Sequence, residues 1–211
     1  MTIARRAVLA LAAAAGAVAL TGAAKVGPPP VTTADMVMGR ADAPVTLIEY
    51  ASVTCSHCAA WNAEVFPAFK RRYVDTGLVR YVMRPLPTAP AEVAVAGFLM
   101  ARCAGRDHYF AVVDDIMRAQ GEMFADGTAR NARPVLLRIG RAHGVDEARF
   151  NACVTDQAAI TAMSREIAGA QAAGVNSTPT FFANGRLIEA GSVEQLDAAL
   201  QPLLPARRRS R

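Results

Sequence analysis

The feature that most constrains this chain is a pair of cysteines three residues apart, Cys55 and Cys58, in the stretch "IEYASVTCSHCAAWN". An apolar, β-branched run precedes the pair and a helix-forming segment follows it. A cysteine at the start of a helix lies beside backbone N–H groups that lack intrahelical partners and at the positive end of the helix dipole. Both effects favour thiolate over thiol. The pattern therefore predicts a reactive cysteine pair at a helix N-terminus.

The two cysteines are expected to have different roles. Cys55 attacks or is attacked, whereas Cys58, deeper in the first turn, is less exposed and resolves a mixed disulfide. His57 adds a hydrogen-bond donor or a positive charge, which would lower the pKa of the Cys55 thiol.

The flanking sequence predicts a strand, a helix and a second strand. Residues 44–52, "PVTLIEYAS", are β-branched and apolar enough for a buried strand. A helix is expected from Cys55 to about Asp75, kinked at Pro67 and ended by Gly77. Residues 78–87, "LVRYVMRPLP", give the next strand. Such a βαβ unit implies a parallel pair of strands with a right-handed crossover.

The remaining sequence changes character twice. Residues 89–173 are rich in alanine, have helical periodicity and contain no convincing strand, which predicts a helical insertion. In "STPTFFANGRLIEAG" an Asn184-Gly185 turn predicts a hairpin, and a final helix follows it. The order indicates an α/β domain formed by residues 44–88 and 174–204, with a helical subdomain inserted into one crossover.

Residues 1–24 are expected to be a secretory signal peptide. Arg5 and Arg6 precede an apolar run of fourteen residues that ends at Leu20, and small residues follow. A membrane anchor would need roughly 18 or more apolar residues. We expect cleavage near Ala23 or Ala24, and export by the general pathway rather than the twin-arginine pathway.

Charge gives no reason to expect nucleic-acid binding. Six of the 23 basic residues lie in the signal segment or in the terminal "PARRRSR", so the 17 others face 18 acidic residues. The body of the chain is therefore near neutral, and residues 205–211 form a basic tail to which no function is assigned. Residues 25–43 are rich in Pro and Gly and are expected to be an extended lead-in rather than part of the core.

Several motifs in order resemble the DsbA family of periplasmic thiol:disulfide oxidoreductases. These are "IEYASVTCSHC", with Glu49 six residues before Cys55, the downstream "STPT", and the helical insert between them. The resemblance covers roughly residues 35–204. It implies a thioredoxin-like fold with an inserted α-helical subdomain, a periplasmic location, no cofactor, and reduced, folding exported proteins as substrates. It also implies a membrane protein that reoxidises the pair.

The resemblance also assigns site residues. Cys55 would be the nucleophile, Cys58 the resolving thiol and His57 the residue that stabilises the thiolate. Pro179 matches the cis-proline that faces the disulfide, and Thr178 would present its backbone to a bound peptide.

Glu49 matches the family's acid beneath the active site, a proton acceptor for Cys58. The alternative for Glu49 is a strand residue that points to solvent. Ser56 departs from the proline of the most oxidising relatives, so the sequence leaves the redox potential open. A disulfide isomerase or reductase of the same fold therefore remains an alternative. Because isomerases of this fold usually carry an added dimerisation domain and residues 26–43 are too short to be one, we expect a monomeric oxidase.

Four cysteines allow three pairings, of which spacing favours Cys55 with Cys58 and Cys103 with Cys153. In an exported protein we expect Cys103 and Cys153 to form a structural disulfide rather than two buried free thiols. Some relatives have a similar second pair.

A metal-binding carrier module that uses Cys55, His57 and Cys58 is the alternative of a different class. Zinc takes four ligands, usually from two separated pairs. The two other histidines, His108 and His143, lie in the insert without metal-binding spacing and are better read as surface or capping residues. No metal site is expected.

Overall fold

The computed structural model describes residues 27–205 of the 211-residue chain. The predicted signal peptide, its cleavage site and the arginines of the basic tail lie outside the described residues.

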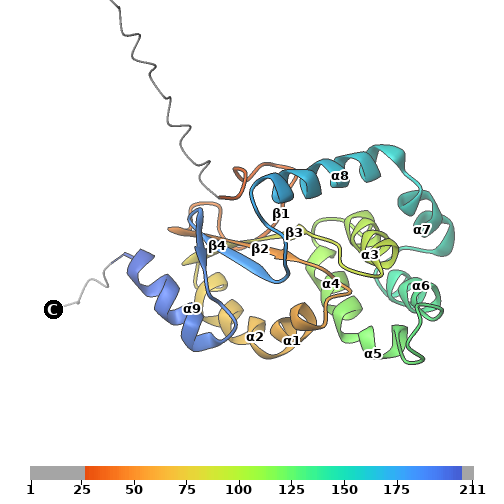
Figure 1. The fold of residues 1–211 in the computed structure, drawn as a ribbon, viewed down its shortest axis with the longest axis horizontal. Helices are drawn as coiled ribbons and strands as arrows, with labels where there is room; N and C mark the ends of the chain where they lie inside the picture. Colours follow the sequence, from red (N-terminus) through yellow and green to blue (C-terminus); the bar gives the residue numbers. More distant parts are fainter. Residues whose placement is uncertain (1–26, 206–211) are drawn as a thin grey trace, which may run out of the picture.

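A five-stranded mixed sheet forms the centre of the fold (Figure 1). The strands lie in the order β1-β3-β2-β4-β5. β2 and β3 are parallel, with Val45 opposite Val79, and the other neighbouring strands are antiparallel. The strands span β1 (Met36–Met38), β2 (Val45–Ala51), β3 (Val79–Pro85), β4 (Thr180–Ala183) and β5 (Arg186–Ile188).

Both faces of β2 are buried, which explains its nearly continuous apolar sequence. Leu47 and Ala51 belong to the larger core, which extends into the helical insert, while Ile48 and Tyr50 pack in a smaller cluster on the opposite face. Because side chains alternate along a strand, Glu49 lies on the same face as Leu47. This acid is therefore inside the larger core.

The helix predicted from Cys55 to about Asp75 is divided into three segments. These are α1 (Ser56–Glu64), α2 (Phe66–Phe69) and a π-helical turn, η1 (Lys70–Val74). Pro67 lies in the first turn of α2, where its missing N–H costs no hydrogen bond. Its ring would clash with the carbonyl four residues earlier in a continuous helix, and α1 ends and α2 begins around Val65, two residues before the proline. Gly77 ends the segment with φ +75°.

Helices alone connect β3 to β4. They are α3 (Ala91–Cys103), α4 (Tyr109–Arg118), α5 (Gln120–Met123), α6 (Ala132–Ala142), α7 (Glu147–Val154) and α8 (Gln157–Ala172). The first five gather beside the sheet, and α8 returns along β3 (Figure 1). After the hairpin come α9 (Val193–Leu200) and a short 3-10 turn, η2 (Gln201–Leu203). Among residues 27–205, no helix has the length and apolar character needed to cross a membrane.

The hairpin follows the predicted turn. Asn184 and Gly185 both have positive φ, +47° and +79°, as expected for the twist-compatible two-residue turn. The Asn184 side chain also accepts a hydrogen bond from the Thr46 N–H at 2.8 Å, which ties the turn to β2.

The lead-in predicted for residues 25–43 needs a correction, because part of it is a sheet strand. β1 pairs with β3, and Met36 is buried. Beside it, Arg84 of β3 donates to both carboxylate oxygens of Asp35, at 2.7 and 3.0 Å. The same guanidinium donates to the carbonyls of Pro29 and Pro30. A three-residue strand is too short to give a periodic signal next to a proline-rich stretch, and a distant arginine holds it in place.

Candidate active site

Cys55 is the N-cap residue of α1, in an extended conformation, and its carbonyl accepts the first helical hydrogen bond from Ala59 at 3.0 Å. Its side chain is half-buried, and its thiol lies 3.5 Å from the Thr178 carbonyl oxygen. Cys58, in the first turn, is fully buried. Both cysteines are free thiols in this structure.

The pKa of the Cys55 thiol is lowered from its usual value. Partial burial opposes ionisation, but the neighbouring Thr178 side chain and the backbone N–H groups of Cys58 and His57 outweigh it. The two N–H groups are donors that the N-terminus of α1 offers to an anion. A thiolate is therefore favoured at the half-exposed position.

The Cys58 thiol shifts in the opposite direction. Burial raises its pKa, the charge of Glu49 raises it further, and the Ser52 N–H opposes both only in part. One helix turn thus holds two thiols of opposite character: one ionises readily and meets solvent, and the other stays protonated inside the core.

His57 contributes through its backbone. Its side chain is exposed and makes no hydrogen bond within residues 27–205, whereas its N–H lowers the pKa of the Cys55 thiol. The effect expected of the imidazole ring stays a prediction.

The Thr178–Pro179 loop lies opposite Cys55. The Thr178–Pro179 peptide bond is cis, and the loop leads directly into β4, the neighbour of β2. The hydroxyl of Thr178 is buried and has no hydrogen-bond partner among the described residues. It is placed to donate to the sulfur of Cys55 when that thiol ionises.

Glu49 is 1% exposed, so the solvent-facing alternative is wrong. The Tyr81 hydroxyl donates to its Oε2 atom, while Oε1 is buried without a partner in the described part of the chain. Burial raises the pKa of Glu49 to about 8, and the Tyr81 hydrogen bond opposes that rise. A buried carboxyl group with a pKa of about 8 is therefore near enough to Cys58 for its charge to act on that thiol.

Several residues of the site carry no sequence signal. Gln120, in α5, donates from Nε2 to the carbonyls of Val53 and Cys55, at 2.8 and 3.1 Å. The Ser52 hydroxyl accepts from the Thr88 N–H at 3.0 Å, which fixes the loop before Cys55. Neither contact follows from sequence spacing, because Gln120 is 65 residues from Cys55 along the chain and Thr88 is 36 residues from Ser52.

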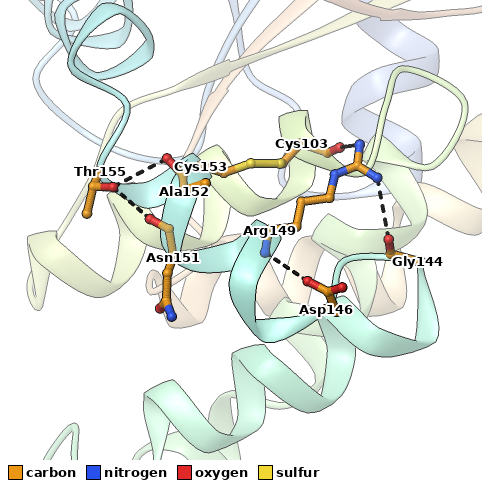
Figure 2. Close-up of a disulfide and its surroundings, with 8 residues drawn as sticks. All are labelled: Cys103, Gly144, Asp146, Arg149, Asn151, Ala152, Cys153 and Thr155. Carbon is orange, nitrogen blue, oxygen red and sulfur yellow. Dashed lines mark hydrogen bonds between the residues drawn. A yellow bond between two sulfur atoms is a disulfide. The ribbon is translucent and has the colours of Figure 1, made fainter.

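Cys103 and Cys153 form a disulfide that joins the end of α3 to α7, with 6.2 Å between their Cα atoms (Figure 2). Arg149 extends along this junction and donates to the Cys103 carbonyl at 2.6 Å. Asp146 caps α7 by accepting from the Arg149 N–H at 2.8 Å. The disulfide closes a loop with a sequence separation of 50 residues within the insert.

The two remaining histidines pack together in the insert, with ring centroids 5.8 Å apart. His143 Nε2 lies 2.7 Å from a carboxylate oxygen of Asp115. Among residues 27–205, no three His, Cys, Asp or Glu side chains gather as potential metal ligands.

Comparison with known proteins places this chain in a family. A thioredoxin family model matches residues 31–202. A Rickettsia bellii protein named "Putative protein-disulfide oxidoreductase" is 30% identical over 167 residues, which cover 79% of this chain and 63% of the relative. This chain therefore spans less than two thirds of that relative's length.

Solved structures share the fold. Wolbachia pipientis alpha-DsbA1 aligns with a TM-score of 0.73 at 23% identity, covering 82% of this chain and 92% of that one. Oxidised BdbD from Bacillus subtilis gives 0.73 at 16% identity, covering 85% and 97%. The chain thus belongs to the thioredoxin family and has the α/β fold of the DsbA proteins, a thioredoxin-like sheet with a helical insertion.

Proposed function

We propose that this protein is a thiol:disulfide oxidoreductase that introduces disulfides into exported proteins through the Cys55–Cys58 pair. The observation that carries the proposal is the contrast between the two thiols. The pKa of half-exposed Cys55 is lowered, whereas burial raises the pKa of Cys58. The protein-disulfide oxidoreductase name of the Rickettsia relative supports the same reaction class.

The reaction starts from the oxidised pair. A substrate thiolate attacks the Cys55 sulfur, the Cys55–Cys58 bond breaks, and Cys58 leaves as a thiolate that takes up a proton. A second substrate thiolate then attacks the substrate sulfur of the mixed disulfide and releases Cys55 as a thiolate. Two electrons have moved from the substrate to the pair, and the substrate has gained a disulfide. Stabilising the leaving Cys55 thiolate favours this direction.

Substrate would bind beside Thr178 and Pro179. Pro179 borders a shallow cavity of about 520 Å³ whose other side includes Leu187 and Ile188 of β5. Leu187 is 64% exposed, and among residues 27–205 no other large apolar side chain is classed as exposed. An extended peptide with an apolar side chain near its cysteine would fit this surface.

The proposal includes a location and partners. The protein would act as a monomer in the periplasm after cleavage near Ala23 or Ala24, on reduced folding proteins, and a membrane protein would reoxidise its cysteines. Glu49 would exchange a proton with Cys58, and His57 would favour the Cys55 thiolate. These assignments rest on the resemblance stated for the sequence together with the geometry of the site.

The test is oxidation of a reduced, unfolded protein by the purified oxidised enzyme, followed by mass. We expect Cys55→Ser and Cys58→Ser each to abolish oxidation, because neither variant can form the Cys55–Cys58 disulfide that takes up the two electrons. The Cys103→Ala/Cys153→Ala double variant is the control that keeps the reactive pair. Unchanged oxidation by Cys55→Ser would overturn the proposal.

The equilibrium potential of the pair against glutathione separates an oxidase from an isomerase or reductase. The reduction potential of strong periplasmic oxidants is about −120 mV, and that of thioredoxin is about −270 mV. Ser56 separates the two cysteines here and influences thiolate stability, so the potential has to be measured. A value near the upper figure supports the oxidase, and one near the lower figure supports a reductase or isomerase.

A further inference from the structure

Tyr81 is an unusual neighbour for a buried carboxyl group. It lies in β3, two residues before Met83, which is opposite Glu49 in the parallel register. Its ring is completely buried, and its hydroxyl donates to Glu49 Oε2. Burial and the charge of Glu49 raise the pKa of the Tyr81 phenol well above its usual value, so the phenol remains a proton donor.

Aromatic packing fixes where that hydroxyl points. Four rings surround Tyr81, with centroid distances between 5.3 and 6.5 Å, from Phe66, Phe69, Phe110 and Trp61. They come from α1 and α2 of the thioredoxin-like part and from α4 of the insert, so both parts of the protein pack against the Tyr81 ring. A ring packed in this way has little freedom to swing away from the carboxylate.

The two oxygens of Glu49 are therefore not equivalent. Oε2 is satisfied by Tyr81, whereas Oε1 is buried without a partner in the described chain. Cys58 is close enough for the charge of Glu49 to raise the pKa of its thiol. A buried carboxylate with one satisfied oxygen and one open oxygen can accept a proton at a defined position.

Among the described residues, Tyr81 donates the side-chain hydrogen bond to Glu49, and the other groups around Glu49 donate none. Met83 of β3 and Phe181 of β4 flank it in register and are apolar. From α1 the titratable neighbour is Cys58, and from α4 it is Tyr109, whose pKa the charge of Glu49 helps to raise. Farther out, the charges of Arg102 in α3, Glu166 in α8 and Asp35 act on Tyr109.

We propose that Tyr81 is a positioning residue for proton exchange between Glu49 and Cys58: it holds Oε2 and leaves Oε1 to take up or return the proton of Cys58, directly or through one water. This inference rests on the proposed function, because it concerns the resolving thiol of that reaction. When Cys58 acts as a nucleophile, its S–H proton moves to Glu49 and the Cys58 thiolate attacks the Cys55 sulfur of a mixed disulfide. The Cys55–Cys58 bond forms, the bond between Cys55 and the partner sulfur breaks, and the partner leaves as a thiolate. When Cys58 leaves as a thiolate, the same proton returns to it.

The energetic role of Tyr81 is to stabilise the carboxylate form. A hydrogen bond to a charged group is stronger than one between neutral groups. Without it, Glu49 would hold its proton to higher pH and would be a poorer acceptor at neutral pH. The loss of one such bond is expected to reduce the carboxylate population about tenfold, a shift of about one pH unit.

The experiment follows single-turnover reaction of the reduced enzyme with oxidised glutathione. Acid quenching and mass measurement separate formation of the Cys55 mixed disulfide from its resolution by Cys58. In the wild type we expect resolution to accelerate through a midpoint near the pKa of Glu49, about 8. In Tyr81→Phe we expect the midpoint to move up by about one unit and resolution at pH 7 to slow about tenfold, with formation unchanged.

Tyr109→Phe is the matched control. Tyr109 is also fully buried in the same core, and its hydroxyl has no hydrogen-bond partner among residues 27–205. We expect its profile to match the wild type. Should Tyr81→Phe fail to fold, 3-fluorotyrosine placed at position 81 keeps the shape and is a stronger donor, and we expect it to lower the midpoint.

The outcomes are distinguishable. If the wild type forms no mixed disulfide at Cys55, the proposed function fails. If formation is normal but Tyr81→Phe and the fluorotyrosine variant keep the wild-type midpoint of resolution, the role of Tyr81 is wrong while the proposed function stands. Equal shifts in Tyr81→Phe and Tyr109→Phe would also overturn it, because they would indicate a general effect of core polarity.

Discussion

Gln120 is hydrogen bonded to Cys55: its side-chain Nε2 donates to the Cys55 carbonyl oxygen at 3.1 Å and also to the Val53 carbonyl at 2.8 Å. Cys55 begins α1 of the thioredoxin-like part, whereas Gln120 begins α5 of the insert. The helical insert therefore helps to hold the loop that carries the reactive sulfur.

Replacing Gln120 tests that relationship. Gln120→Ala removes both hydrogen bonds, each worth about 1 kcal/mol. We expect the N-terminus of α1 to become less fixed and the pKa of the Cys55 thiol to rise, measured as the pH dependence of its alkylation. Gln157→Ala is the control, because Gln157 also donates to a backbone carbonyl, that of Thr155, at an exposed helix start. Identical alkylation profiles for the two variants would contradict the prediction.

Thr178 is expected to tune the redox potential through its hydroxyl. Thr178→Val keeps the shape but removes the donor that favours the Cys55 thiolate. Since the thiolate belongs to the reduced form, that form loses stability and the pair becomes less oxidising. We expect a drop of about 20 mV, equivalent to about 1 kcal/mol for two electrons. Thr178→Ser should stay near the wild-type potential, and a Thr178→Val potential at or above wild type would refute this role.

Glu49 should make the reduced protein less stable as pH rises. The pKa of Glu49 in the folded state, about 8, is above its unfolded value of about 4.3, so the folded state binds more protons between these values. The contribution of Glu49 to the free energy of unfolding is therefore fully present below about pH 4 and is lost as pH increases towards 8. We expect Glu49→Gln to unfold at higher denaturant concentration than the wild type at pH 8, with a smaller difference at pH 5. An equal difference at the two pH values would argue against burial as the cause.

The disulfide of the insert should contribute to stability rather than to turnover. On the chain-entropy estimate, closing a loop of about 50 residues stabilises the fold by roughly 4 kcal/mol. We expect Cys103→Ala/Cys153→Ala to lose most of that in equilibrium unfolding while Cys55 and Cys58 keep their potential. A large change of potential with little change in stability would reverse this assignment.

The ion pair between Asp35 and Arg84 should matter more than an ordinary surface pair. Both side chains are only 10% exposed, and removing Arg84 leaves a carboxylate largely buried without its partner. We expect Arg84→Met to destabilise the fold by about 3 kcal/mol. Arg40→Met is the control, since Arg40 and Asp42 are 68% and 70% exposed, and it should have little effect.

The same ion pair gives a second pH effect. Although burial opposes ionisation, the Arg84 guanidinium and the N–H of Thr32 hold the pKa of Asp35 below its usual value. The contribution of Asp35 to the free energy of unfolding is present above its unfolded pKa of about 3.9 and is lost as pH falls through its folded pKa. The destabilisation caused by Arg84→Met should therefore be smaller at pH 3 than at pH 7, and an equal loss of unfolding free energy at the two pH values would contradict this.

Elements whose causes are local could be predicted from the amino-acid sequence alone. Apolar, β-branched runs predicted β2 and β3, Asn184-Gly185 predicted the hairpin turn, and the cysteine pair located the start of α1. Each of these depends on residues within a few positions, where sterics and hydrogen bonding act directly.

Tertiary structure decided the features that depend on distant partners. β1 is held by β3 and by Arg84. The environment of Glu49 comes from Tyr81 and from the core on its face of the sheet. The sequence of β2 does not show whether Glu49 faces water or a buried tyrosine, because the burial of a strand residue depends on what packs over the strand. The pKa values of the site follow from that packing, and so does the contact from Gln120 to Cys55.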